Sequence, residues 1–428
     1  MTVDLLELAD RLWRGEVAIE EHHPLAQLGA LIEVADGVAF IPSFGNVSAV
    51  ATNGGLVLVD TGGPMVAAAV HDQVRGWSGD PVHTVVYSHG HIDHVFGVKA
   101  FEEGAATPLR VISHENVPAR FDRYVLTAGY NRIINERQFG VTGLEWPVDY
   151  RYPDETYRER HVLTVGGERF ELNHAKGETD DHTWTWVPGR KVLCCGDFFI
   201  WSCPNAGNPQ KVQRYPREWA AALRLMADLG AEIMLPGHGL PVVGAERIAQ
   251  TLVDSADLLD SLHDQVLALM NEGARLDEVI HSVKPPAELI AKPYLRAVYD
   301  KPEFIVRNIW RLYGGWFDGN PAHLEPAPEH ELARELAALV GGADALAARG
   351  RALAKAGELR LAGHLVELAA LAAPTALDVH QARAEVFERR ASAEQSLMGR
   401  GIFSWAAAES RRVVEREAGR ERDRPVGG

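Results

Sequence analysis

Hydrophobic positions in the first half of the chain follow two alternating patterns, one with the period of strands and one with the period of helices. β-Branched runs at residues 57–60 and 82–87 are typical of strands, and a Thr-Gly-Gly turn follows the first of them. A long helical pattern covers residues 116–138, and another begins at Pro216, where proline suits the first turn of a helix. Strands alternating with helices predict a sheet covered by helices. Further strands are expected at residues 109–112, 161–165, 183–187 and 192–193.

The spacing changes after residue 243, where strand patterns almost vanish. Apolar residues recur every three or four positions from Ile248 to Leu269, which predicts one long amphipathic helix. A Gly- and Pro-rich connector at residues 313–328 then leads into leucine-rich helical segments. We therefore expect an α+β protein in three parts, which are residues 1–243 with strands and helices, residues 244–328 with helices, and residues 329–428 with helical hairpins and a charged tail.

The composition excludes several classes of protein. With 46% hydrophobic and 24% charged residues, the chain is neither wholly disordered, nor collagen-like, nor a disulfide scaffold. The formal net charge of −16 argues against nucleic acid or an anionic membrane surface as a partner. No apolar run is long enough to span a membrane. An anionic substrate would need a local cation, such as a bound metal ion, to attract it against this overall charge.

The cysteines and the N-terminus bear on the cellular compartment. The three cysteines, Cys194, Cys195 and Cys203, lie close together without a CxxC motif, and an odd number cannot all pair within the chain. The N-terminal segment carries acidic residues throughout and lacks the uninterrupted apolar core of a secretory signal. We therefore expect reduced thiols and a cytoplasmic location.

The clearest chemical motif is Ser-His-Gly-His-Ile-Asp-His at residues 88–94, directly after the strand pattern at 82–87. Three imidazoles and a carboxylate in one strand-to-helix loop are difficult to explain by packing, and these donors suit Zn²⁺, Fe or Mn. One loop cannot saturate two metal ions, so we expect further ligands at other strand ends, which meet at one edge of a sheet. The candidates in chain order are His174, Glu178, His182, Asp197 and His238.

These motifs, with the Asp-Thr-Gly-Gly turn at 60–63, Gly-Asp-Phe-Phe at 196–199 and Pro-Gly-His-Gly at 236–239, resemble the metallo-β-lactamase superfamily over roughly residues 30–245. The resemblance implies an αββα sandwich, followed here by an all-α domain, and hydrolysis by metal-bound hydroxide. It also implies two divalent metal ions, with zinc expected. The implied ligands are His89 and His91 for the first ion, Asp93, His94 and His238 for the second, and Asp197 as a bridge.

The remaining ligand points to one branch of the superfamily. Many members have a histidine after Pro-Gly at this point, whereas this chain has Glu178 after Lys-Gly. A carboxylate at this position resembles the alkyl sulfatase branch. His174 stays open as the alternative ligand, and His174 and His182 could instead orient Glu178. The Trp-Phe-Asp-Gly-Asn-Pro stretch at residues 316–321 resembles the alkyl sulfatase dimerisation region, and this resemblance implies a homodimer. The apolar surface expected on the helical half is a second reason to expect one.

The loop after Asp197 carries the expected substrate contacts. Its two amides and two cations suit a tetrahedral oxyanion such as sulfate, since Arg donates as a fork and Lys as a point charge. In the alkyl sulfatase branch that the chain resembles, an arginine and an asparagine contact the sulfate, and either Lys211 or Arg214 would be the equivalent of that arginine here. The substrate-binding candidates are Asn205, Asn208, Lys211, Arg214 and, from an earlier polar segment that also carries Arg137, Tyr130.

The favoured function is therefore hydrolysis of an anionic small-molecule ester, an alkyl sulfate above all, with Asp93 and Asp197 as catalytic residues. The alternatives are a lactone, thioester or β-lactam hydrolase, a redox enzyme with a flavodiiron-like centre, and a non-catalytic scaffold. From this sequence, which stops at Gly428, we expect neither the sterol-carrier-like domain of long alkyl sulfatases nor export. Both expectations leave room for a smaller or more polar substrate than a detergent-like sulfate.

Overall fold

The computed structural model describes residues 4–26, 28–103, 105 and 107–422. The chain forms two compact units, one made of residues 1–131 and 146–316 and the other of residues 132–145 and 317–428. The three-part division expected from the sequence, with boundaries after residues 243 and 328, stays a prediction.

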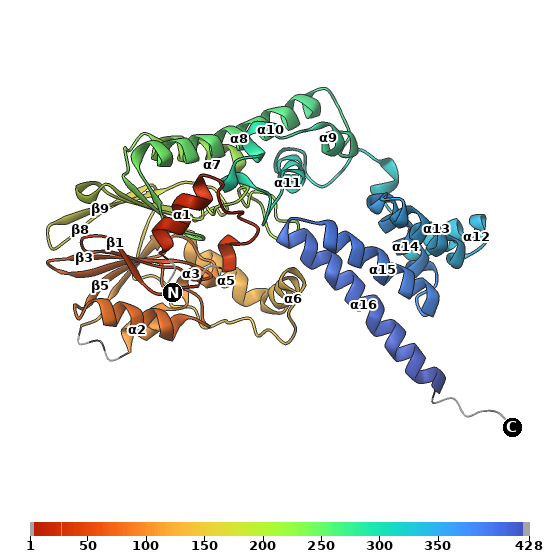
Figure 1. Ribbon diagram of the computed structural model, residues 1–428, viewed down its shortest axis with the longest axis horizontal. Helices are drawn as coiled ribbons and strands as arrows, with labels where there is room; N and C mark the ends of the chain where they lie inside the picture. The colour runs from red at the N-terminus through yellow and green to blue at the C-terminus, as the bar shows by residue number, and fades with distance from the viewer. Residues whose placement is uncertain (1–3, 27, 104, 106, 423–428) are drawn as a thin grey trace. The chain divides into compact units, whose positions relative to one another are not determined.

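Two sheets form the centre of the first unit (Figure 1). In the described residues the first sheet has the order β1-β2-β3-β4-β5-β6-β7 and the second has the order β13-β12-β11-β10-β9-β8. The strands of the first are β1 (Ile32–Ala35), β2 (Val38–Ile41), β3 (Val47–Thr52), β4 (Gly55–Val59), β5 (Val82–Val86), β6 (Arg110–His114) and β7 (Glu155–Tyr157). Those of the second are β8 (Arg160–Val165), β9 (Glu168–His174), β10 (Thr183–Val187), β11 (Val192–Gly196), β12 (Ile233–Pro236) and β13 (Val242–Val243).

Strand direction gathers the motif-bearing loops at one edge. β4 and β5 pair in parallel in the first sheet, so their carboxyl ends lie together. In the second sheet β10 is antiparallel to both β9 and β11, and β11 is parallel to β12. β9, β11 and β12 therefore point the same way, and the loops that follow them emerge at one side of the sheet.

Helices cover the outer face of each sheet, as Figure 1 shows for α2 on one side and α8 on the other. One apolar layer fills the space between the sheets, a second lies under α2 and α5, and a third lies under α1, α7 and α8. Three apolar layers around two sheets make the αββα sandwich that was predicted. The helices of the first unit are α1 (Leu5–Trp13), α2 (Ala67–Trp77), α3 (Ile92–Val95), α4 (Val98–Glu102), α5 (Val117–Leu126), the start of α6 (Ala128–Phe139), α7 (Pro216–Ala227), α8 (Ala245–Asn271), α9 (Leu276–Ser282), α10 (Ala287–Ile290) and α11 (Pro302–Gly314).

Two helical predictions need correction or refinement. The continuous helix expected over residues 116–138 is interrupted at Thr127, whose hydroxyl donates to the Arg123 carbonyl oxygen at 2.7 Å and ends α5. Such local side-chain bonds compete with helix continuation.

The long helix predicted after residue 243 is present as α8, but Leu252, Leu259 and other residues of its apolar face are buried in the core of the same chain. This face is therefore not available to a partner subunit.

The second unit is helical in the described residues, as predicted for the C-terminal part. Its core is built from small and aliphatic side chains such as Ala362, Val366 and Val386. The charged sequence from residue 409 continues as helix to Arg422, and the predicted tail at residues 423–428 lies outside the described residues. No described helix has an apolar stretch that could cross a membrane. The helices are the end of α6, then α12 (Glu329–Val340), α13 (Ala343–Lys355), α14 (Leu359–Ala372), α15 (Leu377–Ala393) and α16 (Leu397–Arg422).

Candidate metal centre

Loops at the carboxyl ends of four strands bring the seven predicted metal ligands together. His89 and His91 follow β5, and Asp93 and His94 lie on the short helix α3 that comes next. The other three follow strands of the second sheet: Glu178 comes after β9, Asp197 directly after β11 and His238 two residues after β12.

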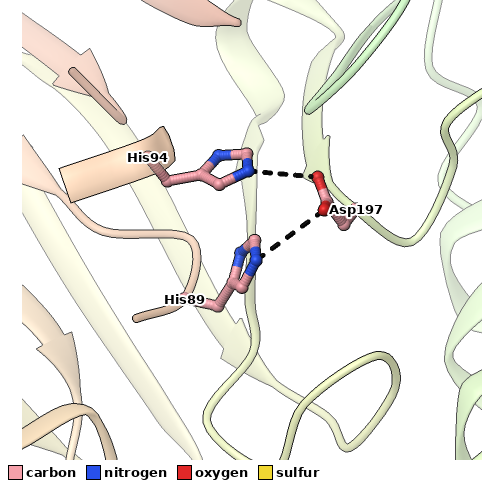
Figure 2. A group of neighbouring side chains, drawn as sticks. All are labelled: His89, His94 and Asp197. Carbon is pink, nitrogen blue, oxygen red and sulfur yellow. Dashed lines mark ion pairs between the residues drawn. The ribbon is translucent and has the colours of Figure 1, made fainter. Parts of the chain in front are cut away.

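Asp197 lies at the centre of this cluster. Figure 2 shows its two carboxylate oxygens facing His89 and His94, with His94 Nε2 3.5 Å from Oδ1 and His89 Nε2 3.7 Å from Oδ2. His238 Nε2 lies 3.3 Å from Asp197 Oδ2 and 3.5 Å from Asp93 Oδ2. Three imidazoles from two sheets thus converge on one buried carboxylate.

The donor atoms form three groups whose members all lie within 4.8 Å of one another. Asp197 belongs to two of the groups and His94 to two, so the groups are continuous. The second group contains the three residues expected to hold one ion, the third contains two residues expected at the other ion together with Asp197, and the first joins residues from both expected sets. The groups are His89, His94 and Asp197; Asp93, His94 and His238; and His91, Glu178 and Asp197.

The cluster also contains buried polar atoms that lack hydrogen-bond partners among the described residues. These atoms are His94 Nε2, Glu178 Oε2, Asp197 Oδ1 and His238 Nδ1. Leaving such groups buried and unpaired is costly, and native structures rarely do so. Imidazole nitrogens and carboxylate oxygens with free lone pairs fit divalent cations of the zinc, iron or manganese type.

The charges in the cluster shift the pKa values of its members strongly. Burial lowers the pKa of His89 well below its usual value, and the neighbouring imidazoles of His94 and His91 add to this effect. Burial opposes the charged form of His94 as well, but the carboxylates of Asp197, Asp93 and Asp60 outweigh it and raise the pKa of His94 well above normal. Burial raises the pKa of Glu178 to about 8, with Arg214 opposing that shift and Asp197 adding to it. Two carboxylates crowded in this way are stabilised by bound cations.

Residues behind the cluster fix the orientation of its histidines. His94 donates its Nδ1 proton to Asp60 Oδ2 at 2.8 Å, which leaves Nε2 facing Asp197. The same carboxylate accepts hydrogen bonds from the Ser88 hydroxyl at 2.6 Å and the Ser88 backbone N–H at 2.7 Å. A Cβ atom at Gly237 would lie 2.0 Å from Asp197 Oδ1, so only glycine fits there.

His174 and His182 flank Glu178 in sequence but stand outside the three donor groups of the described residues. His182 Nε2 accepts a hydrogen bond from the backbone N–H of Asp197 at 3.1 Å. His174 stacks on His114 with ring centroids 3.6 Å apart, and its Nδ1 lies 2.9 Å from the His182 carbonyl oxygen. The structure therefore places Glu178 rather than His174 among the donor atoms, and His182 supports the backbone of Asp197.

The predicted substrate residues fall into three environments. Asn205 and Arg214 both contact Glu178, with Asn205 Nδ2 2.6 Å and an Arg214 Nη atom 2.8 Å from Glu178 Oε1. Lys211 is half-buried, with its ammonium 6.0 Å from the centre of the Trp146 ring, and burial lowers the pKa of Lys211 to about 7. Asn208 is buried, and its Nδ2 lacks a partner among the described residues. Tyr130 is 60% exposed on α6 and belongs to none of the donor groups.

Comparison with known proteins places the chain in a family. The family model of the metallo-β-lactamase superfamily matches residues 41–238, and that of alkyl sulfatase dimerisation matches residues 275–413. A linear primary-alkylsulfatase from Pseudomonas sp. (strain ATCC 19151) is 31% identical over 87% of this chain and 75% of the relative. The chain belongs to the alkylsulfatase family of the metallo-β-lactamase superfamily. It is thus a member of a family of sulfuric ester hydrolases, and the resemblance seen in the sequence is confirmed.

Other alkylsulfatases match a similar share of the chain. An (R)-specific secondary-alkylsulfatase from Pseudomonas sp. is 29% identical over 86% of this chain. The solved structure of the stereoselective inverting sec-alkylsulfatase Pisa1 from Pseudomonas sp. superimposes with a TM-score of 0.81, at 26% identity over 90% of this chain. The chain spans 60% of the length of the secondary-alkylsulfatase and 66% of Pisa1, so the activities of these longer proteins come to it only as proposals.

Sequence reasoning missed one buried ion pair behind the metal centre of this alkylsulfatase-family chain. Arg120 on α5 donates from Nε to Asp181 Oδ2 at 2.7 Å and also pairs with Asp180. The same Asp181 oxygen accepts the backbone N–H of Gly90 at 3.1 Å, and Gly90 lies between His89 and His91. Asp181 belongs to the segment singled out around Glu178, but nothing in the sequence indicated Arg120 as its partner.

Proposed function

We propose that this protein is a dinuclear metal-dependent sulfatase that hydrolyses sulfate monoesters of alkyl or small polar alcohols. The observation that carries the proposal is the chain of donor groups that share Asp197 and His94, in a family whose named relatives are alkylsulfatases. Sulfate monoesters carry a negative charge that repels an attacking nucleophile. Bound metal cations would attract and neutralise this charge, although the protein as a whole has a net charge of −16.

The residues divide into two ligand sets around Asp197. His89, His91 and Glu178 would hold one ion, and Asp93, His94 and His238 would hold the other, with Asp197 between them. Zinc suits this mixture of nitrogen and oxygen ligands. When bound, two such cations supply a water molecule with a pKa near 7 and neutralise charge on the sulfate group.

The chain's own residues would prepare the site in three ways. Asp60 keeps the proton of His94 on Nδ1, so that Nε2 stays available as a ligand. Asn205 and Arg214 orient the Glu178 carboxylate. Asp93 is the most exposed carboxylate of the cluster, at 17% against 3% for Asp197 and Glu178, so it would face the entering ester.

Lys211 and Asn208 are the proposed contacts of the sulfate group. Lys211 adds a half-buried cation, and Asn208 adds a buried N–H donor with no partner among the described residues. A point charge and a neutral donor together suit a tetrahedral oxyanion. Tyr130 is also proposed as a substrate contact, from a side chain that is 60% exposed on α6.

A homodimer is also proposed, supported by the match of residues 275–413 to the alkyl sulfatase dimerisation model. The buried face of α8 does not contribute to this support. The cytoplasmic location stays a prediction.

Metal reconstitution combined with an ester screen tests the proposed function. The chelated full-length protein should be inactive and should regain turnover of alkyl sulfates with about two zinc ions per chain.

Because Pisa1 is described as inverting, which requires attack at carbon, we expect ¹⁸O from labelled water in the alcohol product. Transfer of the label into sulfate would instead show S–O cleavage. Turnover of lactones, thioesters or β-lactams without turnover of any sulfate ester would refute the proposed function.

Replacing Lys211 by alanine should weaken sulfate ester hydrolysis selectively. A hydrogen bond to a charged group contributes about 1.5–3 kcal/mol, so kcat/KM should fall roughly 10- to 100-fold. Lys211→Arg should restore most of this loss, because it returns the charge. Lys355→Ala is the matched control, since Lys355 is exposed on α13 of the other unit. Steady-state kinetics with one alkyl sulfate would measure the effect, and equal activity of Lys211→Ala and Lys355→Ala would exclude Lys211 from the sulfate site.

A further inference from the structure

The loop that carries the proposed sulfate contacts is hydrogen-bonded along its length to a distant segment of the chain. This loop covers residues 200–215, and the distant segment, residues 296–311, includes most of α11. Both belong to the first unit. The distant segment lies inside the stretch that matches the alkyl sulfatase dimerisation model.

The first anchor of the loop is Asp300, which is completely buried. Its Oδ2 accepts the backbone N–H groups of Gly207 at 2.6 Å and Asn208 at 3.2 Å, while its Oδ1 accepts that of Lys301 at 2.7 Å. A Cβ atom at Gly207 would lie 2.5 Å from the carbonyl carbon of Phe304, so the loop backbone lies directly against the first turn of α11. Asp300 therefore fixes the backbone at Asn208, a proposed sulfate contact.

The second anchor is Asn308, which is 3% exposed and brackets Arg214. Asn308 Oδ1 accepts the Arg214 backbone N–H at 3.3 Å, and Asn308 Nδ2 donates to the Arg214 carbonyl oxygen at 3.1 Å. Arg311, one turn later, donates to Gln213 Oε1 at 3.1 Å and to the Lys211 carbonyl oxygen at 3.4 Å. The second anchor thus holds the backbone on both sides of the Lys211–Arg214 stretch.

From these contacts we infer that Asp300, Asn308 and Arg311 are positioning residues for the sulfate site, which rests on the function proposed above. They order the backbone of Asn208, Lys211 and Arg214 before substrate arrives. Binding of the anion then no longer carries the conformational entropy cost of ordering this loop. The segment that matches a dimerisation model accordingly has a second task, which is to set the affinity of the catalytic loop for its anion.

The test compares Asp300→Ala and Arg311→Gln with Arg307→Gln in the metal-loaded full-length protein. Arg307 is exposed one turn before Arg311 on the same helix and is the matched control. We expect KM for an alkyl sulfate and the inhibition constant of inorganic sulfate to rise about 10-fold in Asp300→Ala and about 3-fold in Arg311→Gln. In both variants kcat should change less than twofold and the metal content should be unchanged. Hydrogen exchange at Gly207 and Asn208 should be faster in Asp300→Ala.

Asp300→Asn serves as a second variant if the alanine variant does not fold, because it keeps one acceptor oxygen for the loop and should recover part of the affinity. If the wild-type protein hydrolyses sulfate esters and the anchor variants show the same KM, the inference is overturned, even if the loop amides of the variants exchange faster. A rise in KM that accompanies loss of metal would also overturn the inference, since the substitution would then have disturbed the metal ligands and not only the loop. Absence of sulfate ester turnover in the wild-type protein would refute the proposed function and this inference with it.

Discussion

Asp197→Asn should lower kcat/KM for an alkyl sulfate by at least about 10³-fold and reduce the number of bound metal ions. Asp197 belongs to two of the three donor groups, and its buried carboxylate lies within 3.7 Å of three imidazoles. An amide keeps the size of the side chain but removes one oxygen donor and the negative charge. Both ligand sets would therefore lose their shared member.

Elemental analysis of the purified variant, together with steady-state kinetics, would measure this effect. Asp277→Asn is the matched control, because the Asp277 side chain is 92% exposed on α9. A variant at Asp197 with a full metal complement and near-normal turnover would show that this residue is not a bridge. The proposal of a dinuclear centre would then fail, even if the protein were a sulfatase.

Arg120→Met should destabilise the first unit by about 3–5 kcal/mol, because it leaves a buried carboxylate without its cation. The Arg120 and Asp181 side chains are 5% and 0% exposed, and the pair lies behind the loop that carries His89 and His91. Methionine fills much of the volume of arginine, so the change isolates the lost charge and hydrogen bonds. Urea unfolding of the two proteins at neutral pH would measure the difference in the free energy of unfolding.

This difference should depend on pH in a defined direction. Burial is the largest single influence and would raise the pKa of Asp181. The charge and hydrogen bond of Arg120, together with a hydrogen bond from Thr179, outweigh burial and lower the pKa in the wild-type protein. A lowered pKa contributes stability above the unfolded-state value, which is lost as pH falls through the folded-state value. Without Arg120 the pKa of Asp181 rises, so protonation at lower pH relieves the variant, and the difference should be smaller at pH 5 than at pH 8.

Arg110→Met is the matched control for this prediction. Arg110 pairs with Glu155 in the same unit, but the two side chains are 40% and 37% exposed. Exposed pairs contribute little, so the cost should stay below about 1 kcal/mol. Equal destabilisation by the two substitutions would contradict the role assigned to the Arg120–Asp181 pair.

Much of the candidate donor cluster could be predicted because its residues follow strands. A strand end is recognisable from local sequence, and strands of one direction bring their ends to the same edge of a sheet. The loop after β5 and the positions of Asp197 and His238 therefore followed from strand patterns and motif order. Glu178 came from the family resemblance, and the structure places it among the donor atoms.

The remaining features depend on contacts between residues far apart in sequence. Asp181 and Arg120 are 61 positions apart, and Asp300 and Gly207 are 93 apart, so no local pattern could join them. The sequence also left open whether Lys211 or Arg214 contacts the sulfate, because the position of a cationic residue in a loop does not reveal which acceptor its side chain reaches. The structure pairs Arg214 with Glu178, a contact that no local pattern in the sequence could reveal.

The division of the chain into two units has a practical consequence for fragment design. Residues 132–145 belong to the unit formed by the C-terminal helices, and the backbones of Gly401 and Gln138 approach so closely that a Cβ at Gly401 would lie 2.1 Å from the Gln138 carbonyl oxygen. The polypeptide passes from one unit to the other three times, at residues 131–132, 145–146 and 316–317. A truncated gene ending at codon 316 would therefore expose the second half of α6, and we expect such a product to aggregate rather than behave as an independent catalytic module.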